Sequence, residues 1–429
     1  MSTSQTDTTK ELEVFENQVR TADELMVELD KGHHTCIIVG QTQSGKTGTM
    51  GAIMNIPRIR DNYTIVVITG LSSTDWVKQT KERLNATERT KNIKILHRPQ
   101  LDEFVDLVKG KNDVFIIMDE IQVASMKNQS IYKCFNELGY LESQTLHDKN
   151  IRIVEFTATP DGSIYDIDCV ILAQPGDGYT SSRQLLEDDK IRPYGDLCGF
   201  KFDNETKEVY KDPSTNSIVD KNVKQLVDAI NSFDEPRYHI IRTQCGKKQQ
   251  PTIDNILNQT TKNQLDCNYI KFDKSNKDIN ITDINDILIV KPTKHTLIFI
   301  KELLRCAKTI HKEFIGVCYE RFTNKPDDAT IIQGLLGRLN GYDYNGESIC
   351  FTNIDSIKRY YQLWDSGWED KDIKWSSKTT KKTKDGLTSK QTFNSEPIEE
   401  DVEEQQEPPR KAPAKPKAKA PAKPKAKAK

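Results

Sequence analysis

The chain has 429 residues, a net charge of −2 and nine cysteines. This length allows two domains of ordinary size. We find no apolar run as long as a membrane span, and the polar first ten residues lack the apolar core of a secretory signal, so we expect neither membrane insertion nor secretion. The odd number of cysteines favours reduced thiols in an intracellular (cytoplasmic or nuclear) compartment. Because none forms a C-x-x-C pair, the sequence disfavours a zinc site, and we interpret His33 and His34 as loop residues.

Residues 11–31 have apolar side chains at helical spacing and predict a helix that contains Gln18. An apolar run at 36–39 then predicts a buried strand that leads into the phosphate-binding loop pattern G-x-x-x-x-G-K-T. The pattern is formed by Gly40, Gln41, Thr42, Gln43, Ser44, Gly45, Lys46 and Thr47. Its glycines allow backbone N–H groups to approach phosphate oxygens, while Lys46 reaches the β- and γ-phosphates and Thr47 binds Mg²⁺. The strand context favours nucleotide binding over a chance glycine-rich turn.

More β-branched runs predict a parallel sheet around this loop. We expect strands at residues 63–70, 92–97, 114–118 and 151–156, with helices at 75–84 and 101–108. Asp119 and Glu120 follow one of these strands, at the edge where such sheets bind ligands. Asp119 can hold Mg²⁺, and Glu120 can deprotonate the water that attacks the γ-phosphate. An acid pair at a strand end is often merely solvated, but a phosphate loop in the same sheet favours the catalytic interpretation.

The second half of the chain repeats the alternation of strands and helices. Strands are predicted at 238–243, 286–290, 296–300, 315–319 and 348–352, and a helix near 328–339. The predicted organisation is a disordered N-terminus (1–10), a first domain (11–175), a linker or insertion (176–230), a second domain (231–368) and a disordered tail (369–429). The fold class is therefore α/β, with two tandem domains of parallel sheets and flanking helices.

The tail carries opposite charges in two blocks. Residues 396–407 contain seven acidic residues and no basic one, whereas residues 410–429 contain nine basic residues and no acidic one. The basic block is a Lys/Ala/Pro repeat similar to linker-histone tails, and a mobile polycation of this kind neutralises nucleic-acid phosphates without reading sequence. The alternative to nucleic-acid binding is that the tail only increases solubility. We also expect the acidic block to compete for the basic block at low salt.

Motifs in order along the chain resemble those of superfamily 2 DExx-box helicases and ATPases. Residues 40–47 resemble the Walker A motif, 119–122 the DExx box, 157–160 the S/T-A-T coupling motif and 333–338 the arginine-finger motif. The resemblance covers about residues 15 to 345 and implies two RecA-like domains with ATP bound between them. The ending G-R-x-x-G-Y is similar to a divergent branch in large DNA viruses and phages, which suggests a viral origin.

The resemblance implies a role for each matching residue. Lys46 and Thr47 would bind phosphates and Mg²⁺, Asp119 would hold Mg²⁺, and Glu120 would be the catalytic base. The coupling residues would be Thr157 and Thr159. Arg338 would reach the γ-phosphate from the second domain, Gln333 would line the nucleotide site, and Gln18 would read adenine. Weaker candidates for nucleic-acid contact are Ser72, Arg98, Arg305 and Lys308.

Departures from the family pattern limit what the resemblance implies. Gly341 stands where a second arginine is usual, and the glycine-aspartate motif of the second domain is absent. ATP hydrolysis is therefore expected, while strand separation is less secure. We expect an ATP-dependent nucleic-acid helicase, with DNA favoured over RNA as the partner. The alternatives are a motor that translocates, packages or restricts DNA without unwinding, and a nonenzymatic DNA-binding protein with a vestigial nucleotide site. Polarity and oligomeric state stay open.

Overall fold

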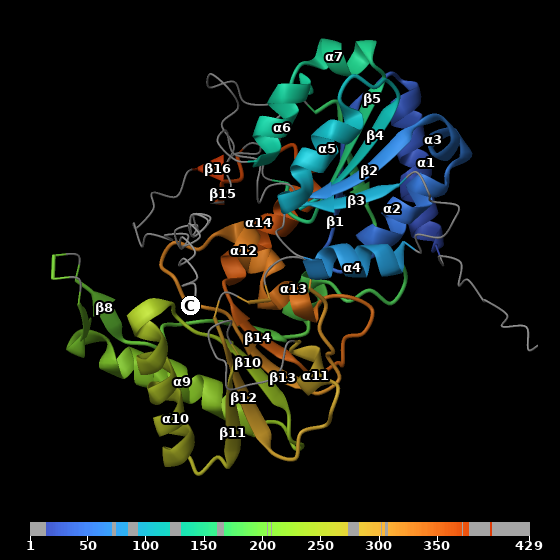
Figure 1. Ribbon diagram of the computed structural model, residues 1–429. Helices are drawn as coiled ribbons and strands as arrows, with labels where there is room; N and C mark the ends of the chain where they lie inside the picture. Colours follow the sequence, from blue (N-terminus) through green and yellow to red (C-terminus); the bar gives the residue numbers. More distant parts are fainter. Residues whose placement is uncertain are drawn as a thin grey trace, which may run out of the picture.

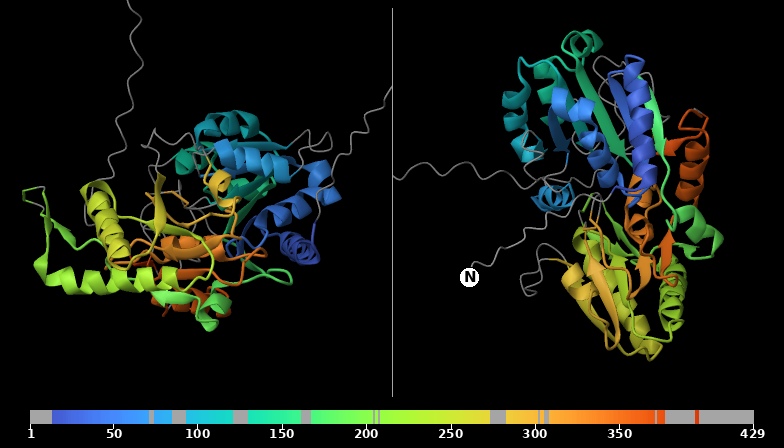
Figure 2. Two further views of the ribbon diagram at one scale, coloured as in Figure 1. Left: turned by 90° about the horizontal axis from the view of Figure 1, so that it is seen from below. Right: turned by 90° about the vertical axis from the view of Figure 1, so that its right-hand side faces the viewer.

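The computed structural model describes residues 14–70, 74–84, 93–120, 130–160, 167–203, 205–206, 208–272, 283–301, 303–304, 308–370, 372–376 and 395–396. They form two α/β units, one above the other in Figure 1 and in the right-hand view of Figure 2. Each unit is built on its own six-stranded parallel sheet, so the predicted fold class of two tandem α/β domains is confirmed. The predicted disordered ends, 1–10 and most of 369–429, lie outside the described residues.

The first sheet has the strand order β3-β2-β4-β5-β1-β6. Its strands are β1 (Thr35–Gly40), β2 (Thr64–Thr69), β3 (Lys94–His97), β4 (Val114–Asp119), β5 (Ile151–Thr157) and β6 (Cys169–Ala173). All neighbouring strands are parallel, and the central ones are apolar and buried on both faces. Every carboxyl end therefore lies at one edge of the sheet, where β1 leads into the phosphate loop.

Helices cover both faces of the first sheet (Figure 1). One face packs against α1 (Glu16–Asp30), α2 (Lys46–Asn55), α3 (Pro57–Asn62) and α4 (Thr74–Arg83). The other face packs against α5 (Leu101–Val108), α6 (Ser130–Leu138) and α7 (Ser143–Asp148). The strands contribute alternate side chains to the two apolar clusters, as the pleat of a buried strand requires. No helix in the described part of the chain has the length and apolar character needed to cross a membrane.

The second sheet has the strand order β11-β12-β10-β13-β14-β7. Its strands are β7 (Ile191–Pro193), β10 (Tyr238–Arg242), β11 (Cys267–Phe272), β12 (His295–Ile300), β13 (Ile315–Tyr319) and β14 (Ile349–Thr352). One face is covered by α9 (Asn216–Asn231) and α10 (Gln249–Lys262). Strand β7 and helix α9 come from the segment 176–230, which the sequence assigned to a linker or insertion.

The remaining elements lie mainly on the side of the second sheet that faces the first unit (Figure 1). They include α8 (Ser182–Glu187), α11 (Asn285–Leu288), α12 (Asp328–Gln333), α13 (Leu335–Leu339) and α14 (Ile354–Asp365). Two small sheets pair β8 (Phe200–Phe202) with β9 (Val209–Lys211) and β15 (Trp375–Ser376) with β16 (Ser395–Glu396). Short 3-10 helices occur at η2 (Arg98–Gln100), η4 (Pro213–Thr215) and η5 (Gly246–Lys248).

The prediction of a strand at residues 286–290 is wrong, because this segment contains helix α11. Ile284 and Leu288 are one helical turn apart and fully buried, whereas Ile289 and Val290 are 58% and 60% exposed. A short apolar run does not distinguish a strand from a helix, and here the i, i+4 pair is fully buried while Ile287 packs only partly against the core. The Asp283 carboxylate accepts a hydrogen bond from the backbone N–H of Asn285 (2.9 Å), which stabilises the helix start.

The helix predicted near residues 328–339 is interrupted at Gly334, which separates α12 from α13. The Glu320 carboxylate accepts a hydrogen bond from the backbone N–H of Leu335 (3.1 Å), the first residue of α13. A Cβ at Gly334 would lie 2.6 Å from Oε2 of Glu320. The break between α12 and α13 thus depends on glycine and a buried carboxylate. Because of it, α13 does not continue α12 and can approach the first unit.

Candidate functional site

The phosphate loop joins β1 to α2 and depends on both of its glycines. Gly45 has φ +94°, which glycine adopts readily, and Lys46 follows it as the first residue of α2. A Cβ at Gly45 would lie 2.7 Å from Nε2 of Gln18, and a Cβ at Gly40 would lie 3.0 Å from Cγ of Lys46. Other residue types would therefore displace the side chains that pack against the loop.

Lys46 lies across the loop that precedes it. Its Nζ donates hydrogen bonds to the backbone oxygens of Gly40 (3.3 Å) and Gln41 (3.2 Å). The amino end of α2 starts at the same residue and adds partial positive charge. Flexible lysine side chains exchange such bonds readily, so this donor set fits the phosphates of a nucleotide.

Asp119 and Glu120 are buried at the carboxyl end of β4. The indole Nε1 of Trp76, on α4, donates a hydrogen bond to Oδ2 of Asp119 (2.8 Å). Burial, and then the charge of Glu120, raise the pKa of Asp119 to about 7, while Lys46 opposes the shift. Two buried carboxylates beside a loop lysine are oxygen ligands of the type that Mg²⁺ prefers, and Thr47 stands in the first turn of α2. The residues therefore fit a magnesium ion.

The second unit reaches this acid pair through Gln333, the last residue of α12. The side-chain amide of Gln333 donates hydrogen bonds to Oε2 of Glu120 (3.1 Å) and to Oγ1 of Thr159 (2.8 Å). Thr159 is buried beyond the end of β5, where its backbone N–H donates to Oγ1 of Thr157 (3.1 Å). Strand β5 lies between β4 and β1, so one amide contacts groups that follow two adjacent strands.

The second unit also contacts the phosphate loop directly. The Gln43 side chain donates hydrogen bonds to the backbone oxygens of Gly337 (3.0 Å) and Arg338 (3.3 Å) in α13. In the opposite direction, the Asn340 amide donates to Oγ1 of Thr42 (2.7 Å). A Cβ at Gly337 would lie 3.1 Å from Cγ2 of Thr42. Glycine at this position therefore allows α13 to approach the loop closely.

Two tyrosines near the contact between α13 and the phosphate loop also bind the backbone of the loop. The Tyr179 hydroxyl donates to the backbone oxygen of Thr42 (2.6 Å), and the Tyr342 hydroxyl donates to that of Ser44 (3.3 Å). Their rings make an edge contact with centroids 5.5 Å apart, and the backbone N–H of Gly176 donates to the Tyr342 hydroxyl (2.9 Å). We did not predict either tyrosine as a site residue. The sequence signals are that each directly follows a glycine in a loop, and that Tyr342 ends the G-R-x-x-G-Y pattern.

Arg338 is 3% exposed and its guanidinium is turned into the second unit. It donates hydrogen bonds to the backbone oxygens of Lys308 and of Gln333, the latter at 3.1 Å. The Nζ of Lys308 makes an ion pair with Asp283 (3.1 Å). The structure therefore places the Arg338 backbone oxygen against the phosphate loop but turns its guanidinium into the second unit, and its role as an arginine finger stays a prediction.

The other predicted residues lie at separate places. Gln18 is on α1, and its amide donates to the backbone oxygen of Gly45 (3.3 Å) while its oxygen accepts from the backbone N–H of Phe15 (3.1 Å). Arg98 starts the short helix η2 at the carboxyl end of β3. Ser72 and Arg305 lie outside the described residues, as does the basic block of the tail.

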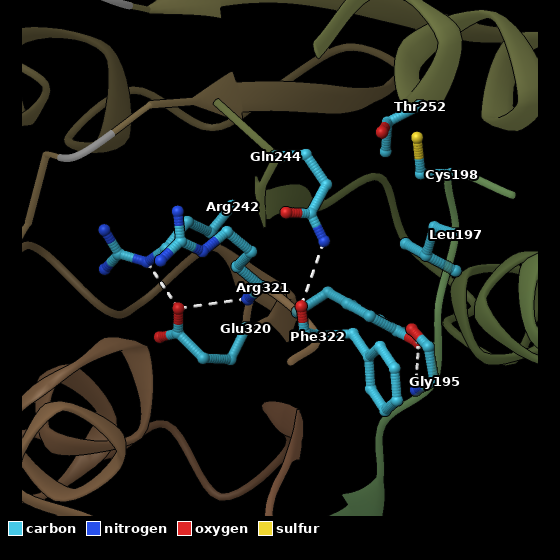
Figure 3. Close-up of a pocket in the computed structure, with 10 residues that line it drawn as sticks. Gly195, Leu197, Cys198, Arg242, Gln244, Thr252, Glu320, Arg321 and Phe322 are labelled. Atoms are coloured by element: carbon cyan, nitrogen blue, oxygen red, sulfur yellow. Dashed lines mark hydrogen bonds and ion pairs between the residues drawn. The ribbon is translucent and has the colours of Figure 1, made fainter. Parts of the chain in front are cut away.

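A pocket in the second unit contains a buried ion pair (Figure 3). Nε of Arg242, at the end of β10, lies 2.5 Å from Oε1 of Glu320, which follows β13. Oε1 also accepts a hydrogen bond from the backbone N–H of Arg321 (3.0 Å), and Oε2 holds the start of α13 at Leu335. Because Glu320 pairs with Arg242 and also binds the first residue of α13, we interpret this pocket as a support for α13.

The chain is similar in sequence to a viral protein. No family model matches the chain. It is 25% identical over 359 residues to uncharacterized protein L594 of Acanthamoeba polyphaga mimivirus, and the match covers 76% of this chain and 82% of that protein. The relative has no described activity in its name, so it supplies no function for this chain.

Solved structures with partial similarity include an ATP-dependent Type ISP restriction-modification enzyme, LlaBIII, bound to DNA. That match has a TM-score of 0.46 at 12% identity and covers 80% of this chain, but the chain spans only 28% of the enzyme's length. Another is Dbp5 of S. cerevisiae bound to RNA and ADP BeF3, with a TM-score of 0.39, 14% identity, and coverage of 84% of this chain and 93% of Dbp5. Because these TM-scores lie below 0.5, we base the function on the residues of the site.

Proposed function

We propose that this protein is an ATP hydrolase that uses hydrolysis to move on nucleic acid. The observation that carries the proposal is the position of the Gln333 amide, which bonds Glu120 and Thr159 at once. Glu120 is our candidate base for hydrolysis, and Thr159 belongs to the candidate coupling motif. A change at Glu120 during hydrolysis therefore alters a bond that holds the second unit, and this is the link that a motor requires.

The roles of the chain's own residues follow from their positions. Lys46 and the amino end of α2 bind the phosphates of ATP, and Thr47 and Asp119 hold the cation. Mg²⁺, when bound, neutralises charge that develops on the transferred phosphoryl group. Glu120 accepts the proton of the attacking water, and Arg338 supplies positive charge from the second unit once α13 turns toward the nucleotide.

Motion on nucleic acid follows from opening and closing of the contact between the two units. The two units close tightly when ATP binds and separate after hydrolysis. Each unit therefore binds the nucleic-acid strand tightly in one state and loosely in the other. The motif order and the basic tail support nucleic acid as the partner, with DNA favoured. We propose helicase activity as the outcome, and a strand-displacement assay separates it from translocation without unwinding.

The deciding experiment measures ATP turnover by the full chain against single- and double-stranded DNA and RNA. We expect stimulation by at least one nucleic acid, and loss of turnover in Lys46→Ala and Glu120→Gln. Arg338→Ala should retain ATP binding but lose turnover. Lys109→Ala is the matched control, because Lys109 directly follows α5 on the other face of the first sheet from α2, and its side chain is 64% exposed. Normal hydrolysis by Lys46→Ala would reject the proposal, and binding of DNA without any turnover would leave a nonenzymatic DNA-binding protein.

A further inference from the structure

A second group of chemically reactive side chains lies at the opposite edge of the first sheet. One ligand-type atom each from Glu28, His33 and Cys169 lie within 4.8 Å of one another. The sulfur of Cys36 lies 2.6 Å from the sulfur of Cys169. Cys36 is near the amino end of β1, whereas the phosphate loop follows the carboxyl end, so about 13 Å of strand separates the two places.

The fold brings these residues together from four segments. Cys36 and Cys169 are directly paired residues of the parallel strands β1 and β6, so their side chains emerge on the same face. Helix α1 covers this face, and Glu28 is in its last turn. The turn after α1 depends on Gly32 at φ +91°, and in it the backbone N–H of His33 donates a hydrogen bond to the backbone oxygen of Glu28 (3.3 Å).

The His33 and Glu28 side chains approach each other beside the Cys169 sulfur. Nδ1 of His33 is shielded from water and lies 2.9 Å from Oε2 of Glu28, without the geometry of a hydrogen bond. The other oxygen of Glu28 pairs with Nζ of Lys31 (2.7 Å). The carboxylate and imidazole are partly exposed, with side-chain exposures of 22% and 33%, so an ion can enter from solvent.

We propose that Glu28, His33, Cys36 and Cys169 bind a zinc ion. Two thiolates, one imidazole and one carboxylate are the donor types that Zn²⁺ takes in tetrahedral sites. Bond lengths of about 2.0 to 2.3 Å place tetrahedral ligand atoms about 3.3 to 3.8 Å apart. The atoms of Glu28, His33 and Cys169 lie within 4.8 Å of one another and must draw together to this spacing. The Cys36 sulfur must move toward Glu28 and His33, and the two sulfur atoms must separate by about 1 Å to admit the ion.

The competing possibility at this place is a disulfide between the two cysteines. A disulfide needs only the paired strands, and it would give no reason for His33 and Glu28 to converge on the same sulfur. A zinc ion uses all of the converging atoms. Coordination would also attach the last turn of α1 to β1 and β6. Because Gln18 in the first turn of α1 contacts the phosphate loop, the ion would stabilise the support of that loop at a distance.

The test is cobalt and zinc binding by the full chain, purified with its thiols reduced and free of metal. We expect one equivalent of Co²⁺ to bind with thiolate-to-cobalt charge transfer and the visible bands of tetrahedral Co²⁺, to be displaced by Zn²⁺, and to raise the melting temperature. Cys169→Ser and His33→Gln should each weaken binding about tenfold or more. These two residues are partly exposed, so both variants should fold.

Matched controls use the same residue types outside the group. Cys267→Ser changes a half-buried cysteine on the edge strand of the other sheet, and His34→Gln changes the neighbouring histidine, whose Nδ1 lies 2.9 Å from the Ile151 oxygen. Both should bind cobalt as the wild type does. The proposal is overturned if the wild type binds no cobalt with all thiols free, or if the controls lose binding equally. None of these outcomes depends on ATP hydrolysis.

Discussion

Replacing Gln333 with alanine removes the amide that joins the second unit to the acid pair of the first. The amide makes one hydrogen bond to the carboxylate of Glu120 (3.1 Å) and one to the hydroxyl of Thr159 (2.8 Å). All of these side chains are buried, and Gln333 itself is 6% exposed. Water therefore does not readily replace the lost donor.

The size of the effect follows from the two bonds. A hydrogen bond to a charged group contributes about 1.5 to 3 kcal/mol and a neutral one about 0.5 to 1.5 kcal/mol. Some of this is recovered if water enters the space left by the side chain, so we take about 2 kcal/mol as the loss. If the closed arrangement of the units is the one that hydrolyses ATP, kcat falls about 30-fold, since each 1.36 kcal/mol is worth a factor of ten.

The assay is steady-state ATP hydrolysis at saturating nucleic acid, with ATP binding measured separately. Gln362→Ala is the matched control, because Gln362 is an exposed glutamine on α14. A double-mutant cycle with Thr159→Val adds a sharper test, since residues that share one hydrogen bond give non-additive effects. If Gln333→Ala turns over ATP at the wild-type rate, or if the cycle is additive, the amide does not couple the two units.

Three further predictions concern other parts of the structure. Gly337→Ala places a Cβ 2.5 Å from the backbone oxygen of Ile332, so we expect a loss of about 1 to 3 kcal/mol of stability in urea unfolding and slower ATP turnover. Trp76→Phe removes the hydrogen bond to Asp119, and the Mg²⁺ concentration for half-maximal turnover should rise about tenfold. Burial lowers the pKa of His239 well below 6.5, so only the unfolded chain gains a proton as pH falls below 6.5. Stability should then decrease by up to about 1.4 kcal/mol per pH unit between pH 6.5 and 5, and unfolding of His239→Gln should show a smaller slope.

The sequence predicted the elements that are determined by interactions between residues close together in the chain. The strand at residues 114–118 and the glycine-lysine turn after β1 depend on neighbouring residues, and the structure has β4 and the phosphate loop there. Strands β6 and β11 were missed because they are edge strands and are not continuously buried. The second sheet recruits β7 by pairing Ile191 with Cys350, which no local pattern of a three-residue strand predicts.

The predicted roles within the site depend on contacts that are distant in sequence. Asp119 and Glu120 could be named from their place after a strand, but their partner Gln333 is more than 200 residues away and was assigned only to the nucleotide site. The group around Cys169 also depends on residues that are distant in sequence. Its cysteines are 133 residues apart and become neighbours only through the pairing of β1 with β6, so the absence of short cysteine spacings disfavoured a zinc site.

The segment that connects the two units also determines how strong their contact has to be. Near Tyr179 it is fixed to both units, because Thr180 pairs with Gly341 while the Tyr179 hydroxyl bonds the phosphate loop. A short connector makes docking of the second unit an intramolecular event, with an effective concentration on the order of millimolar. A few hydrogen bonds are then enough to hold the units together, and each is weak enough to break during the hydrolysis cycle that we propose. Cutting the chain between Gly176 and Gly178 would remove this advantage, and the two halves would separate on dilution although every contact residue is intact.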